Sequence, residues 1–292
     1  MALERPAGMA GRRCVVTGAT RGIGLAAATA LARLGAAVVL VGRDAGRLEG
    51  ARRTVRDAGG PAGAPPPVTI LADLATAAGA AAVVRTLRRE GAPIDVLYNN
   101  AGAIFPAREL TEDGIERTFA LNHLAPFRLT QGLMPLLAAA PAPRVVTVSS
   151  EAHRMAGPQA DDWQSARGYQ PMRAYGRSKL ANILFTSELA RRTAGTALTA
   201  NCFHPGVVRT EFAADARGLL RLAFLLGRPF MRSADAGAAT GVWLASEPGL
   251  SATSGLYFVD ARPRRPSTAA LDPALAGALW DTSVALVGAT TQ

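Results

Sequence analysis

Short apolar runs alternate with longer, helix-like stretches along most of this chain, and this alternation strongly limits how it can fold. The rhythm continues to about residue 205. It is typical of β-α-β units, in which helices cover both faces of a parallel sheet. We therefore expect an α/β fold with one doubly wound parallel sheet of about seven strands, at Arg13–Thr17, Ala37–Val41, Val68–Leu71, Val96–Asn99, Arg144–Ser149, Leu198–Phe203 and Gly255–Val259.

The chain length agrees with one such sheet and its helices. One large α/β core can absorb all 292 residues, so we expect a single domain over residues 1–292. Prolines and glycines between Gly59 and Pro67 predict an enlarged surface loop, because they suit neither a helix nor a sheet ladder. Asp272 and Pro273 suit the cap and first turn of a helix, which predicts a C-terminal helix over about 272–287.

The net charge of +10 does not come from one basic stretch. Arginines are scattered, mostly in pairs between apolar runs, so we expect a solvated Arg-rich surface and no nucleic-acid partner. Cys14 and Cys202 lie in apolar runs, which predicts buried free thiols and neither a disulfide nor a metal site. Residues 1–13 lack the apolar core of a signal peptide and no apolar run could span a bilayer, which predicts a cytoplasmic protein without a stable membrane anchor.

A glycine-rich turn joins the first predicted strand to an Ala-rich helix, over residues 17–24 (TGATRGIG). A pyrophosphate binds well to free N–H groups at a helix N-terminus, and residues without side chains let the backbone approach it closely. A glycine-rich turn without function is the alternative. The predicted dinucleotide contacts in this turn are Gly18, Thr20, Arg21, Gly22, Ile23 and Gly24.

The residues after the second strand bear on which dinucleotide binds. Arg43 lies about 20 residues past the glycine turn, where this type of fold contacts the adenosine ribose. Its planar guanidinium, helped by Arg21, suits a 2′-phosphate and favours NADP(H) over NAD(H). Two alternatives stay open: Asp44 turned inward would serve NAD, and Arg43 could be a solvated residue at a strand end.

Tyr175 and Lys179 are four residues apart, so on a helix they share one face. A charged lysine favours ionised tyrosine and would lower its pKa toward the working range of a general acid/base in carbonyl reduction. By itself, this spacing also fits a surface pair. Ser150 follows a strand at the carboxyl edge, where its hydroxyl could donate to a substrate oxygen, whereas strand alternation should turn its rival Ser149 the other way.

Taken together, these motifs resemble the short-chain dehydrogenase/reductase family. The resemblance covers the whole chain, and it is closest to the retinol-dehydrogenase-like branch. The residues that carry it are the Thr17–Gly24 turn, Asp73, Asn99–Gly102, Asn122–Leu124, Ser149–His153, Tyr175, Ser178–Asn182 and His204–Thr210.

The resemblance implies a Rossmann-type fold and a four-residue site. In such a site Tyr175 exchanges the proton, Lys179 holds the nicotinamide-ribose hydroxyls and lowers the pKa of the tyrosine, Ser150 orients the carbonyl, and Asn122 supports a water relay. The resemblance also implies further cofactor contacts: Asp73 and Leu74 near the adenine, Asn100, Ala101 and Gly102 beside the adenosine ribose, and Pro205, Gly206, Val208 and Thr210 along the nicotinamide.

Pro126 lies four residues after Asn122, so it cannot donate to the Asn122 carbonyl as a helix would require. We hypothesise that this carbonyl binds the relay water, with a simple helix kink as the alternative. His153 and His204 titrate near neutrality, but with Tyr175 and Lys179 supplying proton transfer we expect both to be loop or packing residues.

An apolar segment between Thr210 and Ser233 is expected to form a substrate lid, with a core helix or an interfacial patch as alternatives. Its character suggests a small lipophilic substrate. We therefore predict an NADP(H)-dependent oxidoreductase that interconverts a lipophilic aldehyde or ketone and its alcohol; a catalytically weak NADP(H)-binding sensor or scaffold is the rival. The resemblance permits monomers and homo-oligomers, and we expect this chain to lack the N-terminal membrane anchor that many members of the branch carry.

Overall fold

The computed structural model describes residues 8–157, 161–208 and 231–289. Within these residues, eight strands form one sheet in the order β3-β2-β1-β4-β5-β6-β7-β8, parallel except for the last pair. The doubly wound parallel sheet predicted from the sequence is confirmed. The strands are β1 (Arg13–Thr17), β2 (Ala37–Gly42), β3 (Val68–Leu71), β4 (Val96–Asn99), β5 (Arg144–Val148), β6 (Thr199–His204), β7 (Tyr257–Val259) and β8 (Arg262–Pro263).

The central strands are buried on both faces, as parallel strands under two helix layers must be. Every residue of β4 and β5 is buried. Such strands consist of near-continuous apolar residues rather than alternating ones, which explains why their positions were predictable. The edge strand β3 leaves Val68 and Leu71 exposed.

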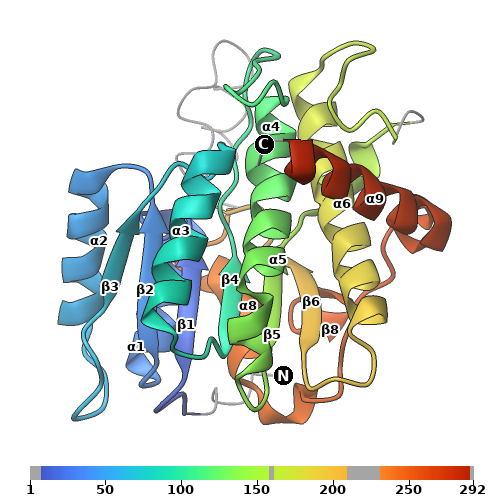
Figure 1. Ribbon diagram of the computed structural model, residues 1–292. Helices are drawn as coiled ribbons and strands as arrows, with labels where there is room; N and C mark the ends of the chain where they lie inside the picture. The colour runs from blue at the N-terminus through green and yellow to red at the C-terminus, as the bar shows by residue number, and fades with distance from the viewer. Residues whose placement is uncertain (1–7, 158–160, 209–230, 290–292) are drawn as a thin grey trace.

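Helices form one layer on each side of the sheet (Figure 1). One layer holds α1 (Gly22–Arg33), α2 (Ala45–Asp57) and α8 (Ala234–Ser246), which share a core with β1 and β2. The other layer holds α3 (Ala77–Glu90), α5 (Ala125–Ala138) and α6 (Pro171–Arg192). Shorter helical segments are α4 (Arg117–Phe119), η1 (Ala120–Leu124), η2 (Glu151–Met155), η5 (Pro248–Leu250) and η6 (Thr268–Leu271).

The C-terminal helix α9 (Pro273–Ala289) lies across the outer side of the α5–α6 layer (Figure 1). The Asp272 carboxylate accepts the N–H groups of Ala274 and Leu275 at 2.9 and 3.2 Å, so it caps the helix as its sequence suggested. The Trp280 ring packs 5.0 Å from the Phe127 ring, centroid to centroid. This contact fixes α9 to α5.

The chain before Pro126 forms a π-helical turn, η1, rather than a simple kink. The N–H of Ala125 donates to the carbonyl of Ala120, one residue farther back than in an α-helix. Because proline cannot donate, a wider turn is a natural way to continue the helix here. The water-binding role of the Asn122 carbonyl stays a prediction.

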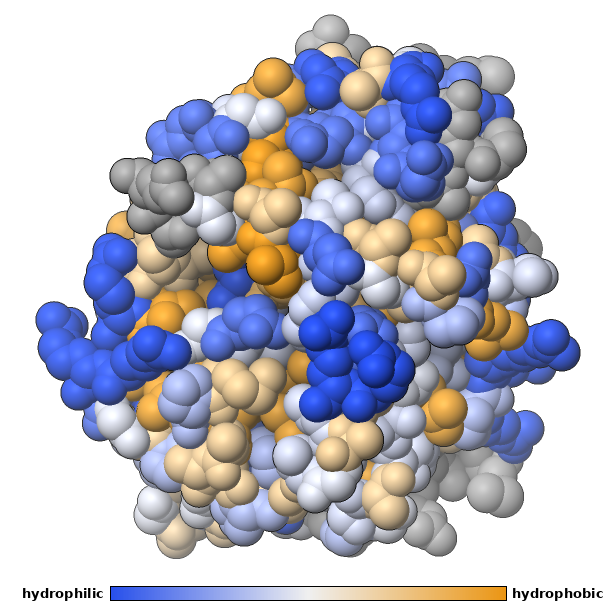
Figure 2. Space-filling model, turned by 45° about the vertical axis from the view of Figure 1, so that its right-hand side comes forward, coloured by the Kyte–Doolittle hydropathy of each residue, from blue (hydrophilic) through white to orange (hydrophobic). Residues whose placement is uncertain are grey.

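Several other expectations concern the surface and the segments around the fold. Hydrophilic and hydrophobic residues are interspersed over the face shown in Figure 2. No helix in the three described ranges is long and apolar enough to cross a membrane. Cys14 and Cys202 are buried free thiols. Thr210 and the expected lid lie outside the described residues, apart from Met231–Ser233.

Candidate active site

The glycine-rich turn connects β1 to α1 at the carboxyl edge of the sheet. Gly18 and Gly22 have φ angles of +62° and +54°, a region that side chains rarely adopt. A Cβ on Gly24 would lie 2.3 Å from the carbonyl oxygen of Gly18, so this glycine is required by close packing instead. Arg21 precedes α1 without a side-chain cap, which leaves backbone N–H groups directed out of the helix start. This end therefore fits a dinucleotide pyrophosphate.

The loop after β4 is fastened to this turn. The Asn100 carboxamide donates to the carbonyl oxygens of Thr17 and Gly18 at 2.9 and 3.2 Å. The Thr17 hydroxyl accepts the N–H groups of Asn100 and Ala101 at 2.9 and 3.0 Å. Thr17 therefore fixes the shape of the site, a role that sequence reasoning missed although the residue ends a predicted strand.

The predicted adenosine end follows β2 and β3 at the same edge of the sheet. Arg43 is exposed directly after β2. The Asp44 carboxylate accepts the N–H of Arg47 at 2.9 Å and caps α2. Asp73 accepts the N–H of Ala75 at 3.0 Å after β3, and the neighbouring Leu74 is buried. Arg43 and Asp44 are the two residues that could face a ribose here, and Asp44 is engaged as the N-cap of α2.

Tyr175, Lys179 and Ser150 come together where β5 meets α6. The Lys179 ammonium lies 5.4 Å from the centroid of the Tyr175 ring. The Ser150 hydroxyl hydrogen-bonds to the hydroxyl of Tyr175. The sequence predicts that Lys179 lowers the pKa of Tyr175, but the structure differs: desolvation raises this pKa to about 12, and the bond from Ser150 opposes the rise only in part. Burial also lowers the pKa of Lys179 to about 8.

The backbone at the end of β5 holds Lys179. The Lys179 ammonium donates to the carbonyl of Val148 at 3.0 Å, and the Asn182 carboxamide donates to the same carbonyl at 3.1 Å. The buried Ser149 hydroxyl donates to the carbonyl of Lys179 at 2.8 Å. Ser149 thus stabilises α6 while Ser150 faces Tyr175, as strand alternation predicts.

The Asn122 side chain joins three segments of the site. Its carboxamide oxygen accepts the N–H of Ala103 at 2.8 Å, and its amide donates to the Ala103 carbonyl at 3.0 Å and to the Ser178 hydroxyl at 2.9 Å. Ser178 in turn donates to the carbonyl of Tyr175 at 2.7 Å. A Cβ on Gly102 would lie 3.6 Å from the Lys179 ammonium. The predicted ribose-binding loop is therefore held beside the lysine.

The predicted nicotinamide segment lies against α8 and the glycine turn. Pro205 is buried, and Gly206 has a φ of +84°. The N–H of Arg232 donates to the carbonyl of Val207 at 2.8 Å. A Cβ on Gly237 of α8 would lie 2.5 Å from Val208 and 3.3 Å from Ile23, so Val208 closes the space between α8 and the turn.

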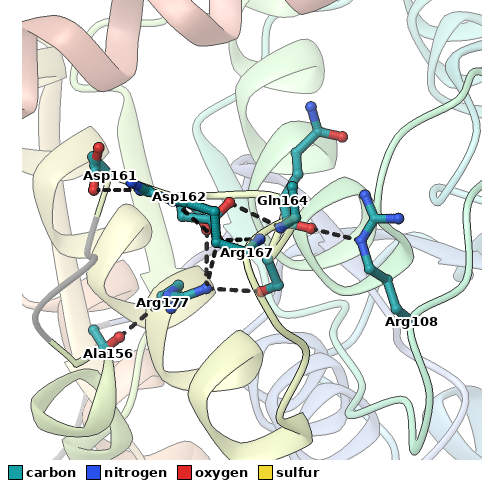
Figure 3. Close-up of polar contacts among 9 residues, drawn as sticks. Arg108, Ala156, Asp161, Asp162, Gln164, Arg167 and Arg177 are labelled. Carbon is teal, nitrogen blue, oxygen red and sulfur yellow. Dashed lines mark hydrogen bonds and ion pairs between the residues drawn. The ribbon is translucent and has the colours of Figure 1, made fainter.

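Arg177, two residues after Tyr175, anchors the loop that leads into α6 (Figure 3). Its buried guanidinium donates to the carbonyls of Ala156 and Asp162 at 3.2 and 3.1 Å and to the Ser165 hydroxyl at 3.1 Å. The Asp162 carboxylate also accepts the N–H of Arg167 at 3.0 Å. Sequence reasoning missed this cluster. The signal that could have indicated it is Arg177 itself, a charged residue among the buried positions of α6.

The same loop is tied to the loop after β4. The Arg108 guanidinium donates to the carbonyl of Gln164 at 3.1 Å (Figure 3). The Tyr169 hydroxyl donates to the carbonyl of Phe105 at 2.8 Å. The loop before α6 and the loop after β4 are thus fixed to each other.

Neither histidine considered from the sequence takes part in the Tyr175 cluster. The ring of His153 contacts the Ser150 carbonyl through Nδ1 at 2.7 Å and accepts the N–H of Ser267 through Nε2 at 3.0 Å, so both nitrogens are engaged. The Nδ1 of His204 accepts the N–H of Glu151 at 3.3 Å. Burial lowers the pKa of both rings.

Known proteins are similar in sequence to this chain over nearly its whole length. Residues 12–218 match the family model for short chain dehydrogenases. The chain is 38% identical to Retinol dehydrogenase 14 of Homo sapiens, over 97% of this chain and 88% of that protein. It is 41% identical to the protein named "Putative daunorubicin C-13 ketoreductase DnrU" of Streptomyces sp. (strain C5), over 98% of this chain and 96% of that protein.

A solved structure shows a similar fold. It is L-sorbose reductase from Gluconobacter frateurii complexed with NADPH and L-sorbose, with a TM-score of 0.68 and 26% identity over 87% of this chain and 96% of that one. With the family match and the relatives above, the protein is an oxidoreductase acting on alcohol or carbonyl groups. It belongs to the short-chain dehydrogenase/reductase family, in the retinol-dehydrogenase-like branch.

Proposed function

We propose that this protein uses NADP(H) to interconvert a lipophilic aldehyde or ketone and the corresponding alcohol. The observation that carries the proposal is the cluster in which the Ser150 hydroxyl bonds to Tyr175 and the Lys179 ammonium lies 5.4 Å from the Tyr175 ring. When bound, the nicotinamide supplies or accepts the hydride at the substrate carbon.

The protein groups handle the substrate oxygen and its proton. Ser150 donates a hydrogen bond that orients the carbonyl, and Tyr175 transfers its proton to the oxygen as the hydride reaches the carbon. With a pKa of about 12, Tyr175 is protonated near neutral pH and is ready to donate. Lys179, whose pKa is about 8, is mostly charged at pH 7 and stabilises the phenolate that remains.

The preference for NADP(H) is supported by the adenosine end. Asp44 caps α2 through the Arg47 N–H, so one oxygen of its carboxylate is already engaged at the start of the helix. The exposed Arg43 can offer a bidentate guanidinium to a 2′-phosphate. L-Sorbose reductase, which has a similar fold, is complexed with NADPH.

The lipophilic substrate class is supported by the relatives. One is named for retinol, an alcohol with a long apolar chain, and another for the C-13 ketone of daunorubicin, a polycyclic compound. Both names denote a ketone or alcohol group on a large carbon frame. We propose the same class for this chain.

The decisive experiment is a substrate screen with the Tyr175→Phe variant as control. NADPH and NADH are first titrated by fluorescence, and nicotinamide absorbance then follows turnover of lipophilic aldehydes, ketones and alcohols. Tyr175→Phe keeps the ring but lacks the transferable proton, so we expect turnover to fall about 10²- to 10⁴-fold with unchanged NADPH affinity. Tight NADPH binding by the wild type without turnover over the whole panel would favour a sensor or scaffold.

A further inference from the structure

A pocket lies beside the segment that follows Ser150. It has a volume of about 440 Å³, and it is lined by Glu151, Arg154, His204, Arg232, Arg264 and Arg265, with Gly206 at one side. Glu151 directly follows Ser150, and Gly206 belongs to the predicted nicotinamide segment. This arginine pocket therefore borders the candidate active site without containing Tyr175 or Lys179.

The charges of the arginine pocket do not cancel. The Arg154 guanidinium pairs with the Glu151 carboxylate at 2.7 Å, and the Arg232 guanidinium pairs with Asp260 at 3.0 Å. Arg264 and Arg265 add two more guanidinium groups on exposed side chains. Four positive groups against two carboxylates leave two positive charges around one concave space.

The histidine in the wall adds a neutral donor of fixed orientation. The Nδ1 atom of His204 accepts the N–H of Glu151, so the proton of the neutral ring lies on Nε2. Burial keeps the pKa of His204 below its ordinary value, which favours this neutral form. The Nε2–H group is thus the polar donor that His204 can present to a ligand.

We infer that the arginine pocket binds the carboxylate or phosphate group of a small molecule. Guanidinium groups offer paired N–H donors that match the two oxygens of a carboxylate or phosphate, and a concave site strengthens these charge-assisted bonds. The anion could belong to a carbonyl substrate whose reactive end reaches Ser150, or to a separate effector. Binding of the anion does not depend on the proposed reaction.

The first test measures anion binding without turnover. The thermal unfolding midpoint of the full chain is followed against inorganic phosphate, with sodium chloride added to hold the ionic strength constant. We expect a saturable rise that needs about tenfold or more phosphate in the Arg264→Ala/Arg265→Ala variant, because charge-assisted bonds are lost. Arg53→Ala/Arg89→Ala, which removes the same charge from exposed positions of α2 and α3, should behave as wild type.

The outcomes of this test are distinct. No saturable rise in the wild type, or an equal rise in Arg264→Ala/Arg265→Ala, would overturn the inference. A rise lost only in that variant supports it, even if no carbonyl compound is ever turned over.

A second measurement assigns the source of the anion. ω-Oxodecanoate and its methyl ester carry the same aldehyde, but only the former carries a carboxylate. If the anion belongs to the substrate, Arg264→Ala/Arg265→Ala raises KM about tenfold for the acid and leaves KM for the ester unchanged. If the two KM values respond alike while phosphate binding is lost, the pocket takes a separate anionic effector.

Discussion

Replacing Gly24 with alanine tests whether the glycine turn is shaped by close backbone contact. A Cβ at this position would lie 2.3 Å from the carbonyl oxygen of Gly18 and 2.4 Å from the side-chain nitrogen of Asn100. The first of these neighbours is backbone, so relief requires the turn to move. Overpacking of this kind costs about 1–3 kcal/mol. We expect a comparable loss of stability, or a displaced turn with NADPH affinity about 5- to 150-fold weaker.

The matched control is Gly50→Ala in the middle of α2. A Cβ there meets nothing within 4 Å. Alanine is the better helix former, so this variant should gain about 0.5–1 kcal/mol and bind NADPH as the wild type does. Urea denaturation and NADPH fluorescence titration give both quantities. If Gly24→Ala matches Gly50→Ala in stability and NADPH affinity, the close approach of Gly24 to the Gly18 carbonyl does not shape the turn.

Three further predictions concern the cofactor, the proton donor and the C-terminal helix. Arg43→Ala should weaken NADPH binding about tenfold or more and leave NADH unchanged, as measured by fluorescence; equal losses for both would contradict a 2′-phosphate contact. The kcat/KM for carbonyl reduction should decline as pH rises through about 8, because Lys179 loses its charge there while Tyr175 stays protonated to about 12. A flat profile of kcat/KM against pH would contradict this role of Lys179. Trp280→Ala, which removes the ring packed on Phe127 and Phe185, should cost about 3–5 kcal/mol in urea denaturation, and a cost below 1 kcal/mol would mean that α9 contributes little.

The sheet could be predicted almost completely because its central strands are buried on two sides. Val96–Asn99 is found at the predicted residues, and the predicted Arg144–Ser149 strand ends one residue earlier, at Val148. The strand β8 was missed because Arg262–Pro263 is short and exposed, and its pairing with β7 is antiparallel. No hydrophobic pattern marks such a strand, since its position depends on its neighbour.

Some residues of the candidate site could likewise be predicted from the sequence, and others could not. Tyr175, Lys179 and Ser150 were identified from spacing, strand alternation and the resemblance to the family, all of which depend on short motifs of the chain. The Arg177 cluster depends instead on contacts with Ala156 and Asp162, 21 and 15 residues away. Because the sequence contains no local trace of these partners, the cluster becomes visible only in the folded structure.

The pKa of Tyr175 shows that burial can outweigh an electrostatic effect expected from local spacing. The four-residue spacing predicts that Lys179 stabilises the phenolate, yet the same folding that places the two groups together removes both from water. Desolvation disfavours each charged form, so it raises the pKa of the tyrosine to about 12 and lowers that of the lysine to about 8. A phenol that holds its proton this firmly is suited to give it up only to an oxygen on which negative charge is developing. Near neutral pH Tyr175 therefore holds its proton, which is the form that a proton donor in carbonyl reduction requires.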